Sequence, residues 1–308
     1  MLKKIAILGA TGHIAKNLIE RFCRTNKYEL FLFARSLDQL NKFLKSIQCN
    51  DAVSSRMFSD FSCADYEVII NCVGIGDPGK LKTEGDSIFR LTETFDNMVL
   101  DYLESHTNAI YINFSSGAAY GTDFSTPVNE FSCTKLDINH IASSDFYGIA
   151  KINSEAKHRA MANLNIIDLR VFGFFSRFID LKAQYFMSEV ISCIKNDEEF
   201  ITGKGNIIRD YVHPHDLISL IEKCINKPAF NEVFDVYSLK PVTKFEILDY
   251  FAQQYGLKYS IKSNINILTA TGTKDNYYSN NKKAEKNGYF PQFTSIDSII
   301  EETKAILS

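Results

Sequence analysis

The 308-residue sequence has no tryptophan, no excess of basic residues and no long apolar run. Its 34 basic side chains face 37 acidic ones, so no surplus of positive charge exists to neutralise the phosphates of a nucleic acid. No window of about 18 consecutive apolar residues occurs, which argues against a membrane-spanning helix. These absences predict a globular protein with neither nucleic acid nor membrane as a partner.

Signatures of zinc sites, disulfide frameworks and export are also missing. The seven cysteines (23, 49, 63, 72, 133, 193 and 224) form no CxxC pair and lie near no histidine at zinc-ligand spacing. We therefore expect free, buried thiols in a reducing cytoplasm. The apolar run Ile5–Leu8 stops at Gly9 and is too short for an export signal, so a cytoplasmic location is favoured.

Short apolar strands alternate with amphipathic helices through the first half of the chain. Strands are predicted at 4–8, 29–33, 68–73, 109–114 and 166–171, and helices at 13–22, 37–47, 88–103 and 147–164. This alternation is typical of an α/β fold with a doubly wound parallel sheet, here over residues 1–171. The less regular remainder predicts a smaller α+β lobe over 172–308, with 233–237 as a candidate strand of the main sheet.

A glycine-rich turn joins the first predicted strand to the first helix and reads Gly9-Ala10-Thr11-Gly12-His13-Ile14-Ala15. Small residues in such a turn let backbone N–H groups and the positive end of the helix approach a pyrophosphate. We therefore expect a Rossmann-type cofactor site at Gly9, Thr11, Gly12, His13 and Ile14. The alternative is a tight turn that holds no ligand.

The ends of the next strands bear on the choice of dinucleotide. Where NAD-binding sheets carry a carboxylate for the adenosine ribose, this chain has Arg35 and no acidic residue before Asp38. Because an arginine can pair with a 2′-phosphate, NADP(H) is favoured and NAD(H) is the alternative. Asp60 is a candidate contact for the adenine edge, and Cys72-Val73-Gly74 is a candidate backbone path beside the cofactor.

Tyr147 and Lys151 lie one turn apart on the same face of a predicted helix. A phenol titrates near about pH 10, but a neighbouring ammonium lowers that pKa, so the pair is a candidate general acid–base. The fourth strand runs into Ser115-Ser116-Gly117 at the carboxyl edge of the sheet, where such sheets bind ligands. Ser116 is the candidate to hold a substrate oxygen, and its two neighbours are candidate substrate contacts.

Together these motifs resemble the extended short-chain dehydrogenases/reductases, a family of NAD(P)-dependent nucleotide-sugar epimerases, dehydratases and ketoreductases. The resemblance rests on the glycine-rich turn, the segment from Ser115 to Gly121, the Tyr147/Lys151 pair, and the stretch Gly203-Lys204-Gly205-Asn206-Ile207-Ile208-Arg209-Asp210-Tyr211-Val212-His213. It implies Ser116, Tyr147 and Lys151 as catalytic residues, Lys151 also at the nicotinamide ribose, and Arg209 at the diphosphate of a nucleotide-sugar substrate. It also implies that the lobe over 172–308 is the substrate-binding lobe. A surface ion pair of Arg209 with Asp210 or Asp216 is the alternative.

One departure from the family narrows the reaction. The 4,6-dehydratases carry an Asp-Glu pair after the catalytic hydroxyl residue, whereas this chain has Gly117 and Ala118, so dehydration is disfavoured. We expect an NADPH-dependent reductase of a nucleotide-linked 4-keto-6-deoxy sugar. The alternatives are an NAD-dependent nucleotide-sugar 4-epimerase and a dinucleotide-sensing protein without catalysis. Phe172, from an aromatic-rich stretch, is a candidate pocket residue, although packing is the commoner role for such residues.

The resemblance also implies a homodimer in which the helix of Tyr147 and the helix over Ile88–Leu103 pair across a two-fold axis. The ring of apolar residues around Ile88–Leu103 is broader than one buried stripe requires, which is consistent with a partner. The long spacing from Ser116 to Tyr147 predicts an enlarged loop within 131–146. His213 and His215 have no third ligand near them in the sequence, so no metal site is expected.

Overall fold

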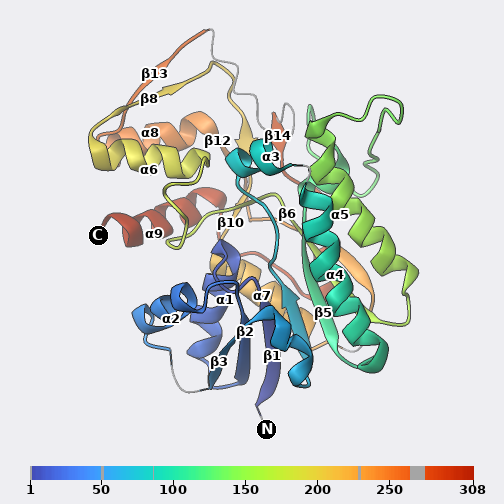
Figure 1. The fold of residues 1–308 in the computed structure, drawn as a ribbon. Coiled ribbons are helices and arrows are strands. Elements are labelled where there is room, and N and C mark those ends of the chain that lie inside the picture. Colours follow the sequence, from blue (N-terminus) through green and yellow to red (C-terminus); the bar gives the residue numbers. More distant parts are fainter. Residues whose placement is uncertain (1, 50–51, 86, 228–229, 264–274) are drawn as a thin grey trace.

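The computed structural model describes residues 2–49, 52–85, 87–227, 230–263 and 275–308. Its main sheet has the strand order β11-β6-β5-β4-β1-β2-β3, and every neighbouring pair is parallel (Figure 1). The strands are β1 (Lys3–Leu8), β2 (Tyr28–Phe33), β3 (Val53–Arg56), β4 (Val68–Asn71), β5 (Ile110–Ser116), β6 (Asn165–Val171) and β11 (Glu232–Val236). The predicted α/β fold with a doubly wound parallel sheet is confirmed.

Helices cover both faces of this sheet because its strands are apolar on both sides. On one face, Ile5 and Ile7 pack in a cluster with residues of α1 (His13–Cys23), α2 (Leu37–Ser46) and α7 (Pro214–Ile225). On the other face, Ala6 and Leu8 belong to a cluster that includes apolar residues of α4 (Ser87–Ser105). Helix α5 (Ser143–Ala160) lies beside α4 (Figure 1). Such double coverage is why the strands read as continuous apolar runs.

The second half of the chain builds most of a smaller lobe beyond the carboxyl edge of the sheet (Figure 1). Its apolar core brings together residues of three helices, α6 (Phe186–Asn196), α8 (Lys244–Tyr255) and α9 (Ser295–Leu307). Short strands surround them: β7 (Gly173–Phe174) with β10 (Tyr211–Val212), β8 (Glu199–Thr202) with β13 (Lys258–Ile261), and the group β12 (Val242–Thr243), β9 (Ile208–Arg209) and β14 (Asn276–Tyr277). The mixture of helices and short strands is α+β in character.

The two parts of the chain interleave. Strand β11 pairs in parallel with β6, and α7 packs on the face of the sheet that α1 also covers. Both elements come from beyond residue 171, so the main sheet draws on the chain's second half as well as its first. A division into domains at residue 171 therefore stays a prediction.

One expectation about the cysteines is wrong. Cys23, at the end of α1, forms a disulfide with Cys49, which follows α2, and their Cα atoms lie 5.6 Å apart. The other five cysteines are free thiols, as predicted, but of these only Cys224 is buried, whereas Cys63 and Cys133 are exposed. The 26-residue separation gives no local signal, because only the return of the chain toward β3 brings the two cysteines together. Among the described residues, none of the helices combines the length and apolarity needed to cross a membrane.

Candidate active site

The glycine-rich turn lies where the chain passes from β1 to α1, beside the exit of β4. Gly9 adopts a φ of +74°, and a Cβ there would lie 3.1 Å from backbone atoms of Cys72 and Val73. Gly12 is the N-cap of α1 and donates its N–H to Gly9 O at 2.8 Å. The first N–H groups of α1 have no partners within the helix and could bind an anion, and the absence of side chains at the two glycines lets the turn close tightly against the Cys72–Val73 backbone.

Three other residues of the glycine-rich turn are candidates for the cofactor site. Thr11, His13 and Ile14 are half-buried, and Ile14 packs against the core beneath the turn. The His13 ring lies 5.0 Å from the Phe174 ring, and its Nε2 is 2.8 Å from Ser176 Oγ. Burial lowers the pKa of His13 to about 4, so this imidazole is neutral at pH 7. His13 therefore offers the turn a neutral side chain and a backbone N–H.

The remaining predicted cofactor residues follow the strands β2, β3 and β4, of which β4 lies on one side of β1 and the other two on the opposite side. Arg35 is exposed just after β2, and Asp60 lies in the short helix η1 (Phe58–Cys63), where it accepts from Met57 N at 3.3 Å. Cys72, Val73 and Gly74 follow β4. The structure thus brings the Cys72–Gly74 segment against the glycine-rich turn, and places Arg35 and Asp60 further along the edge.

Helix α5 positions the tyrosine–lysine pair. Lys151 is buried, donates from Nζ to Phe114 O at 2.8 Å, and lies 5.8 Å from the centre of the Tyr147 ring. Tyr147 is half-buried. A Cβ on Gly148 would lie 2.5 Å from Ala118 O, so glycine at this position lets the helix approach the segment that follows β5. The close approach brings Tyr147 toward Ser116, which ends that strand.

Ser116 meets a residue that the sequence did not single out. Its Oγ lies 3.2 Å from Tyr277 Oη and also accepts from Ala118 N at 3.2 Å. Burial raises the pKa of Tyr277 far above that of a free phenol, and Tyr147 interacts with it electrostatically in the same direction. Tyr277 therefore presents a neutral hydroxyl beside Ser116 and Tyr147.

Arg209 lies on the other side of Tyr277. The two residues are register partners in β9 and β14, and the Arg209 guanidinium is 5.6 Å from the Tyr277 ring centre. Burial lowers the pKa of Arg209 somewhat from its ordinary value. The suggested partners are engaged elsewhere, Asp210 with Ser238 and Ser295, and Asp216 with the backbone N–H groups of residues 292 and 293. The guanidinium is thus held against an aromatic ring at the edge of the Ser116 site.

Phe172 closes the same region and explains a departure from the family pattern. A Cβ on Gly117 would lie 2.4 Å from Phe172 Cδ1, so any side chain at position 117 would collide with this ring. Phe172 also packs 5.2 Å from the Tyr277 ring and 6.3 Å from the Tyr120 ring. A carboxylate at position 117 has no room beside this ring.

Ser115 points away from this group. Its Oγ donates to Glu155 Oε1 at 2.5 Å in the buried interface between β5 and α5, and Glu155 also binds Arg170. Successive side chains of a strand point to opposite faces, and this period was the signal that separates Ser115 from Ser116. The structure therefore brings Ser116, Gly117, Tyr147, Phe172, Arg209 and Tyr277 together and leaves Ser115 outside.

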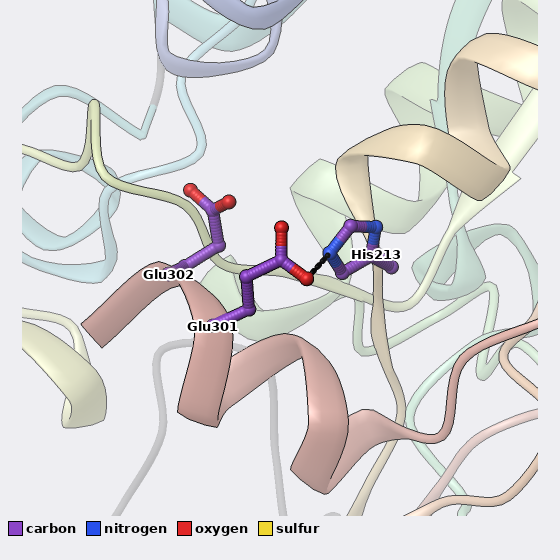
Figure 2. Close-up of side chains that lie close together, drawn as sticks. All are labelled: His213, Glu301 and Glu302. Atoms are coloured by element: carbon purple, nitrogen blue, oxygen red, sulfur yellow. Dashed lines mark ion pairs between the residues drawn. The ribbon is translucent and has the colours of Figure 1, made fainter. Parts of the chain in front are cut away.

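A second cluster lies on α9 and at the start of α7 (Figure 2). One atom each of His213, Glu301 and Glu302 lies within 4.8 Å of the others. The two glutamates are potential metal ligands that the sequence did not indicate, because they lie far from His213 along the chain. His213 Nδ1 accepts from His215 N at 3.1 Å, which puts the ring proton of the neutral side chain on Nε2, 3.4 Å from Glu301 Oε2. Both Glu302 oxygens bind Arg177. These contacts account for the cluster without an ion.

Comparison with known proteins agrees with this geometry. The sequence profile described as "NAD dependent epimerase/dehydratase family" matches residues 5–239. No curated protein sequence gives a significant match.

Solved structures share the fold at low sequence identity. A UDP-glucuronic acid 4-epimerase from Bacillus cereus, in complex with UDP-glucuronic acid and NAD, superposes with a TM-score of 0.82 and 15% identity, covering 99% of both chains. A dTDP-glucose 4,6-dehydratase from Bacillus anthracis in complex with NAD gives 0.78 and 16%, covering 98% of this chain and 96% of the other. A UDP-glucose 4-epimerase from Thermotoga maritima gives 0.79 and 17%, covering 99% and 100%. Because the profile spans most of the sequence, and the fold and the glycine-rich turn agree with it, the chain belongs to the NAD dependent epimerase/dehydratase family.

Proposed function

We propose that this protein is an NAD-dependent nucleotide-sugar 4-epimerase. The observation that carries the proposal is the convergence of Ser116, Tyr147 and Lys151 beside the glycine-rich turn, at a place where Gly117 and Phe172 leave no room for a carboxylate. Two of the similar solved structures are described as 4-epimerases, one of them with NAD, and this favours epimerisation over the reduction expected from the sequence. Dehydration would need acid and base groups that positions 117 and 118 do not supply.

Each residue of the proposed site would have its own role in the reaction. Tyr147 would take the proton from the sugar hydroxyl and later return it, Ser116 would hydrogen-bond the same oxygen, and Lys151 would place its positive charge beside Tyr147. Arg209 binds the diphosphate of the substrate as a bidentate donor. Gly9, Gly12 and the Cys72–Gly74 backbone would hold a dinucleotide, which would supply hydride transfer when bound.

The test is conversion without added cofactor. The purified protein is incubated with UDP-, dTDP-, GDP- and CDP-linked hexoses, and the 4-epimer is quantified by NMR, while the dinucleotide released on denaturation is identified by mass spectrometry. We expect epimer formation and bound NAD. Tyr147→Phe should lower the rate by about 10²- to 10⁴-fold, whereas Tyr250→Phe, in α8, should match the wild type.

Arg35 is the specific observation behind a second candidate function, NADPH-dependent reduction of a nucleotide-linked 4-keto-6-deoxy sugar. It follows β2 where a carboxylate would favour NAD, and it is exposed, so a 2′-phosphate can reach it. Consumption of NADPH with a keto sugar, and no epimer from any hexose, would replace the first proposal with this one. Dinucleotide binding without turnover of any substrate would instead favour a cofactor-sensing protein.

A homodimer is the expected assembly. The surface of α4, however, does not offer the broad apolar face from which the sequence analysis argued for a partner. Most of its apolar residues pack within the chain, and exposed positions such as Glu93, Thr94 and Asp101 are polar. Large apolar side chains are exposed instead at Phe131 and Ile138, in the long loop before α5. Sedimentation of the wild type and of a Phe131→Ser/Ile138→Ser variant tests the proposal, and a wild-type monomer at micromolar concentration would contradict it.

A further inference from the structure

A cluster of charged side chains is sealed between α4, α5 and the sheet, on the same helix as Tyr147 but beyond its reach. His158 of α5 has no exposed surface, and neither does Asp168 of β6, while Asp96 of α4 is almost completely buried. Lys157 and Arg159 approach the two carboxylates from the rim, at 2.6 Å and 2.8 Å. The proposed catalytic steps use none of these groups.

The geometry determines the charge of His158. Its Nε2 lies 2.7 Å from Asp96 Oδ1 and its Nδ1 lies 2.9 Å from both Asp168 oxygens. A neutral imidazole has one N–H and one lone pair, and the lone pair would face a carboxylate oxygen at hydrogen-bond distance. A proton on each ring nitrogen gives every one of these contacts a donor and an acceptor. His158 is an imidazolium in the protein interior.

The groups that face His158 from the neighbouring elements agree with this state. They are Asp96 from α4, Asp168 from β6 and the Tyr111 ring from β5, with Lys157 and Arg159 on its own helix. Burial alone lowers the pKa of His158, but hydrogen bonds and charges from Asp168 and Asp96 outweigh it and raise the pKa to about 9. Burial likewise raises the pKa of Asp96, but His158 and Lys157 outweigh it and hold the pKa below its ordinary value.

A directed chain of hydrogen bonds leads from this cluster to the exit of β4. Tyr111 Oη donates to Asp96 Oδ1 at 3.0 Å and accepts from Asn71 Nδ2 at 3.0 Å. Asn71 Oδ1 then accepts from Val73 N at 3.0 Å. Because Asp96 is charged, it can only accept, so it fixes the direction of the Tyr111 hydroxyl and hence which end of the Asn71 amide faces Val73.

The Cys72–Gly74 backbone, which these hydrogen bonds hold, lies between the glycine-rich turn and the Tyr147–Lys151 pair. Gly9 of the turn approaches Cys72 and Val73 so closely that a Cβ would lie 3.1 Å from them. A Cβ on Gly74, the next residue, would lie 3.8 Å from Lys151 Nζ. A shift of Val73 would therefore change the spacing between the glycine-rich turn and the Tyr147–Lys151 pair.

We propose that the Asp96–His158–Asp168 cluster is a positioning unit, which acts through Tyr111 and Asn71 to hold the Cys72–Gly74 segment in the conformation that binds the dinucleotide. It rests on the proposed cofactor site. The residues of the cluster touch neither cofactor nor substrate. Their effect is on the affinity for the dinucleotide rather than on the chemical step.

The decisive variant is Tyr111→Phe, which removes one link and leaves the ring and the cluster in place. Its matched control is Tyr66→Phe, because Tyr66 belongs to the same apolar cluster and its buried hydroxyl donates to Phe61 O at 2.9 Å, away from the β4 exit. Calorimetry of NAD binding should show about five- to tenfold weaker affinity for Tyr111→Phe and less than a twofold change for Tyr66→Phe. The turnover number at saturating NAD should change less than the affinity.

A second measurement keeps the proposal testable if Tyr111→Phe does not fold. Nitrogen-15 NMR of the wild-type protein, with the His158 signals assigned from their loss in His158→Gln, should show both ring nitrogens protonated at pH 7.5. A neutral His158, or unchanged NAD affinity in Tyr111→Phe, would overturn the positioning unit and leave the proposed function standing. Failure of the wild type to bind NAD or NADP at all would overturn both.

Discussion

Helix α5 carries two polar regions that contain similar types of residue but have different roles. Toward its N-terminus, Tyr147 is half-buried beside Lys151 and faces Ser116 and Tyr277 at the edge of the sheet. Toward its C-terminus, His158 is sealed with two carboxylates and the fully buried Tyr111. Access separates the two regions. A tyrosine that a ligand can reach is able to exchange a proton, whereas burial raises the pKa of Tyr111 well above that of a free phenol and leaves it a fixed donor.

The two lysines of α5 give the largest expected contrast. Lys151→Met should lower the turnover number by at least about 10²-fold, because Tyr147 loses the cation beside it, with little loss of secondary structure. Lys157→Met should leave turnover within about threefold and lower stability by roughly 1–3 kcal/mol, because Asp96 loses one of its cations. Steady-state kinetics and urea unfolding measure the two effects. Equal loss of turnover in both variants would erase the distinction.

The sealed region should also govern the pH dependence of stability. His158 has its pKa raised to about 9, so its stabilising effect is complete below an unfolded value of about 6.5 and is lost as the pH rises through 9. Between these limits the wild type should lose roughly 3 kcal/mol relative to His158→Gln in urea unfolding. Parallel curves for the two proteins across this range would contradict a charged His158.

A smaller effect is expected from the hydroxyl that borders the open region. Tyr277→Phe keeps the ring against Arg209 and Phe172 but removes the hydroxyl beside Ser116. We expect kcat/KM to fall by about tenfold, without the loss of NAD affinity expected for Tyr111→Phe. If Tyr277→Phe weakened NAD binding and left kcat/KM per bound cofactor unchanged, the two regions would have exchanged roles.

The most selective effect, confined to one of the two dinucleotides, should come from the exposed Arg35, at the far edge of the open region. Arg35→Ser should leave the affinity for NAD within twofold and weaken NADP binding by about tenfold, because only NADP carries a phosphate for this side chain. Calorimetry with each dinucleotide provides the comparison. Unchanged NADP affinity would remove the one observation that favours the reductase.

The sequence predicted those elements that depend on interactions between residues close together along the chain. The strands at 4–8 and 29–33 and the helix at 13–22 match β1, β2 and α1 to within one residue, because apolar period and a glycine-rich turn act over a few residues. Tyr147 and Lys151 were found because a helix places residues four apart on one face. Helix α5 begins earlier than predicted because Asp145 caps its start by accepting from Ala142 N.

Other residues carried no local signal. Tyr277 reaches Ser116 only because β14 pairs with β9, far away in the sequence, and Glu301 reaches His213 only because α9 packs beside the start of α7. The Cys23–Cys49 disulfide likewise depends on how the chain returns after α2. Such pairs are set by long-range packing, and no short window of sequence contains both partners.

The sequence by itself determined the parallel sheet, the phosphate turn and the tyrosine–lysine pair, because each follows from residues close together along the chain. Only the tertiary structure decided which groups surround them. It turned Ser115 away from the site, set Phe172 against Gly117 and enclosed His158 between two carboxylates. Burial and the distance to a partner charge set whether a side chain reacts or holds the fold, and both arise only when distant segments pack together.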